Sequence, residues 1–240
     1  MAVITASPAM ADKLLDNLDY NLRFGYSLGG TAPINMPSSI RSLDRYGLTP
    51  NFTLGMDIHK ALSSKWGVTL GLHIENKGMD IDATVKNYHM EIIRGGQSLE
   101  GYFTGKNTTE VEQWMLTVPL QATYSFSDKL RVKFGPYASY VRSRKFSGYA
   151  SDGYLRVGNP TGTKVEIGNE PGNRGTYDFS DSMRHIQVGV MIGADWFFYK
   201  QWGAFADISW GMSDIFHSSF DTIEQTLYPI YGTLGIAYKL

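Results

Sequence analysis

Residues 114–141 read Trp114-Met-Leu-Thr-Val-Pro-Leu-Gln-Ala-Thr-Tyr-Ser-Phe126, then Ser127-Asp-Lys129, then Leu130-Arg-Val-Lys-Phe-Gly-Pro-Tyr-Ala-Ser-Tyr-Val141. In both long parts every second residue is apolar or aromatic, and most residues between them are polar or small. This period of two predicts β-strands, because successive side chains of a strand point to opposite faces. The three polar residues between the two strands, residues 127–129, predict a tight hairpin turn. Each strand is about twice the usual five or six residues, which is long enough to cross a bilayer as part of a barrel.

The composition of the 240-residue chain fits a membrane barrel and excludes other classes. A net charge of -1 and a pI of about 6.5 give no basic surface for nucleic acid, so no such partner is expected. Mean hydropathy is -0.22, and no run of about eighteen apolar residues predicts a transmembrane helix. Without cysteine, the chain has no disulfide and no thiolate ligand or nucleophile.

The same alternation recurs along the chain and predicts eight strands. These are residues 22–31, 48–62, 66–75 with a polar continuation to 85, 114–126, 130–141, 183–198, 202–212 and 228–240. Tight turns at 63–65, 127–129 and 199–201 alternate with long polar connections. Short turns at one end and long loops at the other are typical of an all-β, antiparallel, up-and-down transmembrane β-barrel. An even strand count places both termini in the periplasm.

The amino-terminal residues read as a leader before the barrel. Residues 1–11 end in a small-x-small pattern like that of a signal cleavage site, but no basic region or full apolar core precedes it. The segment is therefore either the tail of a secretory signal or a flexible leader. We expect residues 1–20 to be this leader and residues 21–240 to be the outer-membrane barrel domain.

Aromatic residues gather at the short-turn ends of the predicted strands. Aromatic residues at such positions form the interfacial belts of membrane proteins. The expected belt consists of Trp66, Phe126, Trp196, Tyr199, Trp202 and Tyr238.

The two faces of the strands differ in charge. The apolar face carries no charged residue, as expected of a face in contact with outer-membrane lipid, where Lys or Arg at mid-depth costs about 2–4 kcal/mol. The other face collects Arg23, Asp57, His59, His73, Glu75, Arg131, Lys133, Asp195, Asp207 and Lys239. A barrel of about eight strands is only wide enough for side chains to fill it. We therefore predict that these residues form an ion-pair plug, with a proton or ion path as the alternative.

Several motifs resemble those of the PorT-like small outer-membrane β-barrel proteins of Bacteroidetes. They are Leu116-Thr-Val-Pro-Leu120, Lys133-Phe-Gly-Pro-Tyr137, Val188-Gly-Val-Met-Ile-Gly193, Ser209-Trp-Gly-Met212 and Leu234-Gly-Ile-Ala-Tyr-Lys-Leu240. The chain departs from that family at Asp207-Ile208, where members often carry Arg-Tyr, and at Leu240, where barrels usually end in an aromatic residue. The resemblance implies a bacterial outer-membrane location and a role in envelope transport or type IX secretion.

No motif predicts catalysis, a cofactor or a metal site. His59 and His73 face inward, whereas His89 and His217 fall in predicted loops, the latter beside Ser218 and Ser219. A histidine beside serine is common by chance and does not make a catalytic site. We expect a non-catalytic binding, structural or secretion-accessory protein, with a protein or glycan partner at loops 78–110 and 142–182. The alternatives are a narrow channel for small solutes or ions, an outer-membrane lipid-modifying enzyme, and a soluble lipocalin-like binder with reversed faces.

Overall fold

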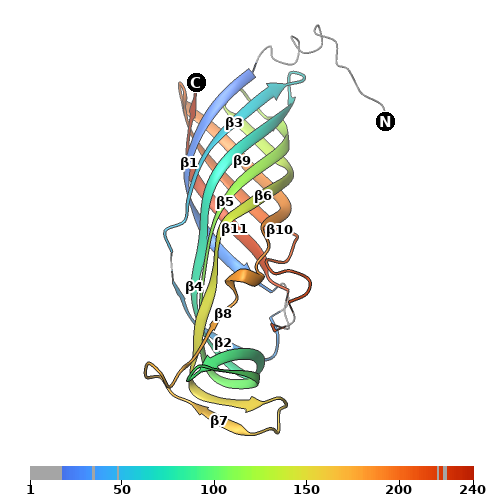
Figure 1. The fold of residues 1–240 in the computed structure, drawn as a ribbon. Helices are drawn as coiled ribbons and strands as arrows, with labels where there is room; N and C mark the ends of the chain where they lie inside the picture. Colours follow the sequence, from blue (N-terminus) through green and yellow to red (C-terminus); the bar gives the residue numbers. More distant parts are fainter. Residues whose placement is uncertain (1–17, 34–35, 48, 221, 224–225) are drawn as a thin grey trace, which may run out of the picture.

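The computed structural model describes residues 18–33, 36–47, 49–220, 222–223 and 226–240. Eight of the described strands close into an antiparallel barrel, which confirms the expected fold class (Figure 1). The predicted leader falls almost wholly in residues 1–17, outside the described residues. Among the described residues, no helix has the length and apolar character needed to cross a bilayer.

The barrel strands pair with one another in chain order. They are β1 (Leu18–Ala32), β3 (Phe52–Ala61), β4 (Trp66–Arg94), β5 (Gln97–Ser125), β6 (Leu130–Val157), β9 (Ile186–Tyr199), β10 (Trp202–Gly211) and β11 (Tyr228–Lys239). β11 pairs with β1 from Asn21–Lys239 to Ala32–Tyr228, so the sheet forms a ring. Closing the ring satisfies backbone groups that an open sheet would leave exposed to lipid.

Tight turns join β3 to β4, β5 to β6 and β9 to β10 at one end of the barrel. Ser63 Oγ accepts a hydrogen bond from the backbone N–H of Trp66 (3.1 Å), and Ser127 Oγ accepts one from that of Leu130 (3.2 Å). In the third turn Lys200 has a φ of 48°, a left-handed conformation common in two-residue hairpins. The turns thus lie where the sequence predicted them, within one or two residues.

Apart from the polar continuation expected to residue 85, the segments 78–110 and 142–182 were predicted to be loops, but they are mostly strand, so that expectation was wrong. β4 and β5 each have 29 residues, and β6 has 28. β4 and β5 meet at Gly95 and Gly96, whose φ values of 58° and 79° glycine adopts without strain. His89 accordingly lies on β4 and not in a loop. These residues are held in strands by pairing with their neighbours and carry no apolar stripe that faces lipid. The alternation that predicts membrane strands is therefore absent from their sequence.

Short strands add to this sheet beyond the barrel. β2 (Ile40–Gly47) pairs with β4, β7 (Lys164–Ile167) pairs with β6, and β8 (Gly175–Asp178) pairs with both β4 and β6. A 3-10 turn, η1 (Ser180–Ser182), leads from β8 back towards β9. We call this part the extension: residues 76–112, residues 142–182 and β2. Figure 1 shows it at the opposite end from the chain terminus of β11, with β7 at its tip.

The distribution of polar and apolar side chains reverses between the barrel and the extension. On the barrel, outward residues such as Phe24, Leu54 and Ile74 are apolar and between 52% and 57% exposed, while most inward residues are polar and buried. In the extension the buried side is apolar. Its core contains Met79, Ala83, Val85, Met90, Ile92, Phe103, Val111, Phe146, Ala150, Leu155, Ile167 and Tyr177. The extension therefore has the burial pattern of a water-soluble fold, and the barrel has that of a lipid-facing one.

The six residues of the predicted aromatic belt all lie at the short-turn end. Trp66 packs against Tyr124 with ring centres 5.0 Å apart, and Trp202 packs against Tyr238 at 4.9 Å. Phe126, Trp196 and Tyr199 are exposed near the same turns. Their role at a membrane interface stays a prediction.

Candidate functional site

A cluster of charged side chains fills the middle of the lumen around Arg23 of β1. The Arg23 guanidinium lies 3.1 Å from Asp57 of β3, 3.4 Å from Asp195 of β9 and 2.7 Å from Asp207 of β10. Its Cζ lies 3.8 Å from the centre of the Phe205 ring. Only 2% of the Arg23 side chain is exposed, so one buried cation links four strands.

Lys133 of β6 joins the same carboxylates from another part of the wall. Its Nζ lies 3.2 Å from Asp57 and 3.0 Å from Asp195. His73 Nε2 lies 2.7 Å from the other oxygen of Asp57. An unpaired buried charge is strongly destabilising, so each of these groups depends on the others. We call this set the lumen cluster: Arg23, Asp57, His73, Lys133, Asp195 and Asp207.

Inward-facing glycines make room for the lumen cluster. Gly55 lies beside His73 in the β3–β4 register, and Gly193 lies beside Asp207 in the β9–β10 register. A Cβ added to Gly55 would collide with the His73 ring, and one added to Gly193 would collide with the Asp207 carboxylate. Because these inward-facing glycines have no side chain, they leave room for the charged side chains of residues opposite them on adjacent strands.

Further ion pairs lie on either side of the lumen cluster. Lys77 Nζ lies 3.0 Å from Glu75 in the direction of the extension. At the short-turn end, Asp19 lies 2.7 Å from Arg131 and 2.9 Å from Lys239.

The structure thus pairs nine of the ten predicted lumen residues with opposite charges, counting His73, whereas His59 Nδ1 contacts the Thr69 hydroxyl at 3.1 Å. Asp19 and Lys77 belong to the same set and were missed. Asp19 was assigned to the leader. Lys77 lies two residues beyond Glu75 on the same face, in the polar continuation that was predicted beyond the membrane-crossing strand. Among the described residues, the charges of the lumen ion pairs balance, because five basic residues face five acidic ones. These are Arg23, Lys77, Arg131, Lys133 and Lys239 against Asp19, Asp57, Glu75, Asp195 and Asp207.

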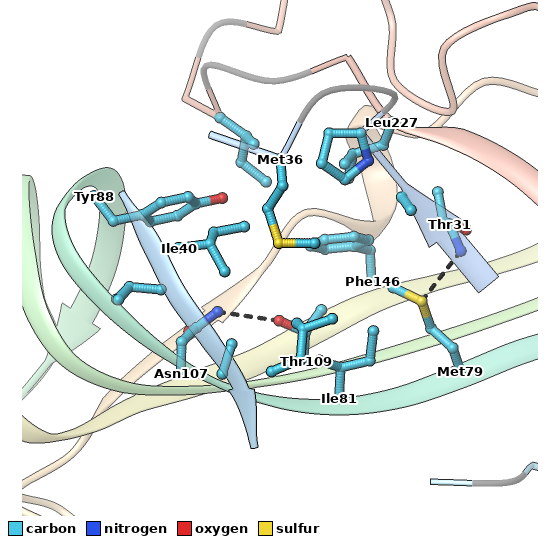
Figure 2. Close-up of a pocket in the computed structure, with 16 residues that line it drawn as sticks. Thr31, Met36, Ile40, Met79, Ile81, Tyr88, Asn107, Thr109, Phe146 and Leu227 are labelled. Carbon is cyan, nitrogen blue, oxygen red and sulfur yellow. Dashed lines mark hydrogen bonds between the residues drawn. The ribbon is translucent and has the colours of Figure 1, made fainter. Parts of the chain in front are cut away.

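A second candidate site is an apolar cavity where the extension meets the barrel. Its volume is about 110 Å³. Figure 2 shows the side chains of Met36, Ile40 and Phe146 converging on it. The full lining is Thr31, Ala32, Pro33, Met36, Ile40, Leu43, Met79, Ile81, Ala83, Val85, Tyr88, Asn107, Thr109, Phe146, Ile223 and Leu227. Most of these side chains are apolar, and Asn107 Nδ2 donates to the Thr109 hydroxyl across 3.1 Å (Figure 2).

The tip of the extension presents aromatic rings together with basic side chains. Lys164 Nζ lies 4.7 Å and Arg156 Cζ lies 5.7 Å from the centre of the Tyr154 ring. Arg174 Cζ lies 4.4 Å from the centre of the Tyr149 ring. Cations held over aromatic faces at these distances are attracted by the ring quadrupole, which orders long side chains at a surface.

Elsewhere the surface of the extension is held by exposed ion pairs. Arg45 of β2 lies 2.9 Å from Asp80 and 2.7 Å from Asp82 of β4. A hydrogen bond from the Thr108 hydroxyl and the nearby Arg45 guanidinium lower the pKa of Asp82. Inside the extension, burial raises the pKa of Tyr177 to about 12.

Comparison with known proteins identifies the domain. Residues 9–217 match the model of a family described as an outer membrane protein beta-barrel domain. The chain belongs to this outer-membrane β-barrel family. Its location is therefore the bacterial outer membrane, as predicted. In barrels of this membrane the short turns face the periplasm, so we expect the extension to lie outside the cell.

The chain is similar to several solved outer-membrane proteins at low identity. Ail of Yersinia pestis, solved with the heparin analogue sucrose octasulfate, is 8% identical with a TM-score of 0.41, covering 93% of this chain and 97% of Ail. CarO2 of Acinetobacter baumannii is 12% identical with a TM-score of 0.41, covering 92% and 99%. OprG of Pseudomonas aeruginosa is 13% identical with a TM-score of 0.35, covering 92% and 95%. No curated protein matches the chain.

The histidines weighed as catalytic candidates lie apart in this outer-membrane barrel. His89 Nε2 lies 3.3 Å from Glu100 and packs against the Tyr102 ring. His217 is exposed, and its backbone N–H donates to the carbonyl of Ser182 (2.9 Å). Within the described ranges, no three His, Cys, Asp or Glu side chains gather as a metal-binding group.

Proposed function

We propose that this protein is a non-conducting, non-catalytic barrel that holds a rigid β-sheet outside the cell as a binding element. The filled lumen carries the proposal. Arg23, Lys133 and their carboxylate partners reach the lumen from β1, β3, β6, β9 and β10, and every member of this group is less than 10% exposed. An eight-stranded barrel is only wide enough for its side chains, so charges that pair across it close it to solutes.

Planar bilayers test whether the lumen conducts. We expect the purified protein to give no single-channel steps above the leak of the bare bilayer in roughly 1 M KCl, where the Debye length is about 3 Å. A porin reconstituted in the same way is the positive control. Steady unit conductance steps from the wild-type barrel would replace this proposal with the narrow-channel alternative.

The binding role rests on the order and surface of the extension. β4, β5 and β6 continue from the barrel wall without a break, so the extension is anchored by three strands and not by flexible loops. Rigid surfaces lose less conformational entropy on binding. Tyr and Arg are the residues most enriched at binding hot spots, and Tyr154, Arg156 and Arg174 lie at the tip. These features favour a protein partner over a glycan.

Photo-crosslinking in intact cells tests the binding surface. A photoreactive phenylalanine analogue in place of Tyr154 should give discrete crosslinked protein bands. The same analogue in place of Val118, which faces outward from the barrel and is 40% exposed, should give none. Crosslinked bands of equal intensity from both positions, or none from Tyr154, would contradict a partner at the tip.

The finer assignment as a PorT-like protein, with a role in envelope transport or type IX secretion, also belongs to this proposal. It is supported by the motifs in β5, β6, β9, β10 and β11. A partner captured at Tyr154 that belongs to a secretion apparatus would support it.

A further inference from the structure

Among the described residues, β1 and β2 face each other over an interval of the wall in which no strand pairing is formed between them. β1 pairs with β3 from Leu18 to Tyr26, which lies opposite Phe52. Beyond that point β1 continues to Ala32 and pairs only with β11, while the returning chain forms β2 and pairs with β4. The edges of β1 (28–32) and β2 therefore face each other without a ladder. We call this interval the seam.

Side chains close the seam in place of backbone hydrogen bonds. The Tyr46 hydroxyl donates to the carbonyl of Gly29, and the backbone N–H of Thr31 donates to Met79 Sδ across 3.1 Å (Figure 2). Thioether sulfur is a weak acceptor, so this bond is poorer than the carbonyl bond it replaces. The wall is thus held here by flexible side chains instead of a sheet.

Apolar spaces lie on both sides of the seam. The cavity of Figure 2 lies behind it, and a shallow groove lies in front, lined also by Leu28 and Ile230, which are 46% and 41% exposed on the outward face. The two spaces share five lining residues: Thr31, Ala32, Leu43, Met79 and Ile81. Among the described residues, these five side chains lie between the cavity and the outward apolar surface of the barrel.

From this arrangement we infer that the cavity binds a small apolar molecule about the size of a benzene ring, which enters from the bilayer through the seam. A dry apolar cavity of about 150 Å³ is known to take benzene or xenon, and this cavity measures about 110 Å³. Asn107 Nδ2 donates to Thr109, while Asn107 Oδ1 accepts no hydrogen bond in the described part of the chain, so the polar atoms of the lining are few and most of it is apolar. Apolar solutes concentrate in the bilayer, and the groove lies on the face that meets it.

Crystals soaked with bromobenzene test the site in the wild-type protein. We expect an anomalous bromine peak between Ile40, Met79 and Phe146. Binding in solution is followed with fluorobenzene by ¹⁹F NMR of the full chain in nanodiscs. Ala83 lines the cavity and is buried, so Ala83→Phe fills it and should weaken fluorobenzene binding at least tenfold. Met90→Ala, which alters the same core away from the cavity, should leave binding unchanged.

The entry route is tested by variants that change the seam in opposite directions. Tyr46→Ala removes the hydroxyl that holds Gly29 and should speed fluorobenzene exchange severalfold at unchanged affinity. A Cβ at Gly30 would lie 2.9 Å from Met79 Sδ, so Gly30→Leu should slow exchange. Absence of a bromine peak in the cavity, or equal affinity in Ala83→Phe, would overturn the site. Unchanged exchange in both seam variants would overturn the route.

Discussion

Replacing Arg23 with methionine is expected to lower the free energy of unfolding by about 3–5 kcal/mol, the cost of breaking a buried ion pair from one side. The long apolar side chain keeps much of the contact with Phe205 but removes the charge. Among the described residues, Asp57 and Asp195 would then keep Lys133 as a cationic partner, and Asp57 would keep its contact with His73. Repulsion among buried carboxylates adds to the lost attraction.

Urea unfolding in lipid vesicles, followed by the heat-modifiable shift in gel migration, measures this change. Arg45→Met is the matched control, because Arg45 also contacts two carboxylates, Asp80 and Asp82, but is 56% exposed. Exposed pairs contribute about 0–1 kcal/mol, so the control should unfold near the wild-type midpoint. Equal losses in the two variants would mean that the lumen cluster is hydrated like the surface.

Replacing Leu120 with arginine is expected to cost about 2–4 kcal/mol, the value for a cation on the lipid face near mid-depth. Leu120 of β5 lies midway in sequence between Trp114 and Phe126, points outward and is 51% exposed. In water such a substitution on an exposed strand position would change stability little. The penalty therefore reports contact with hydrocarbon and not lost packing.

The same unfolding assay measures this second variant. Thr163→Arg, at an exposed position between β6 and β7 in the extension, adds the same side chain outside the cell and should stay within about 0.5 kcal/mol of wild type. A Leu120→Arg protein as stable as Thr163→Arg would show that the outward face of β5 does not meet lipid.

The two results together would locate the boundary between lipid and water along one continuous sheet. β5 passes from an outward leucine at residue 120 to an outward glutamate at residue 112, while its inward residues change from Gln121 to the buried Val111. One strand thus serves a lipid-facing barrel and a water-facing extension. Under the proposed function, this continuity would let the filled barrel hold a binding surface in a fixed orientation outside the cell.

The sequence by itself determined which face of each strand a side chain occupies. The period of two at 114–141 and the matching segments predicted eight strands, three tight turns and the inward position of Arg23, Asp57 and Asp207. These are local properties, because the direction of a side chain follows from its place in its own strand. The uncharged outward face, together with the alternation of short turns and long connections, predicted a membrane barrel, and the resemblance implied its location.

Only the tertiary structure decided which inward residues meet. Arg23 and Asp207 are 184 residues apart and contact because β1 closes the ring through β11 in one register. The length of β4–β6, the reversal of polarity in the extension, and the seam between β1 and β2 depend on strand pairing in the same way. Pairing and register depend on partner strands distant in sequence, and no local period of apolar residues encodes them.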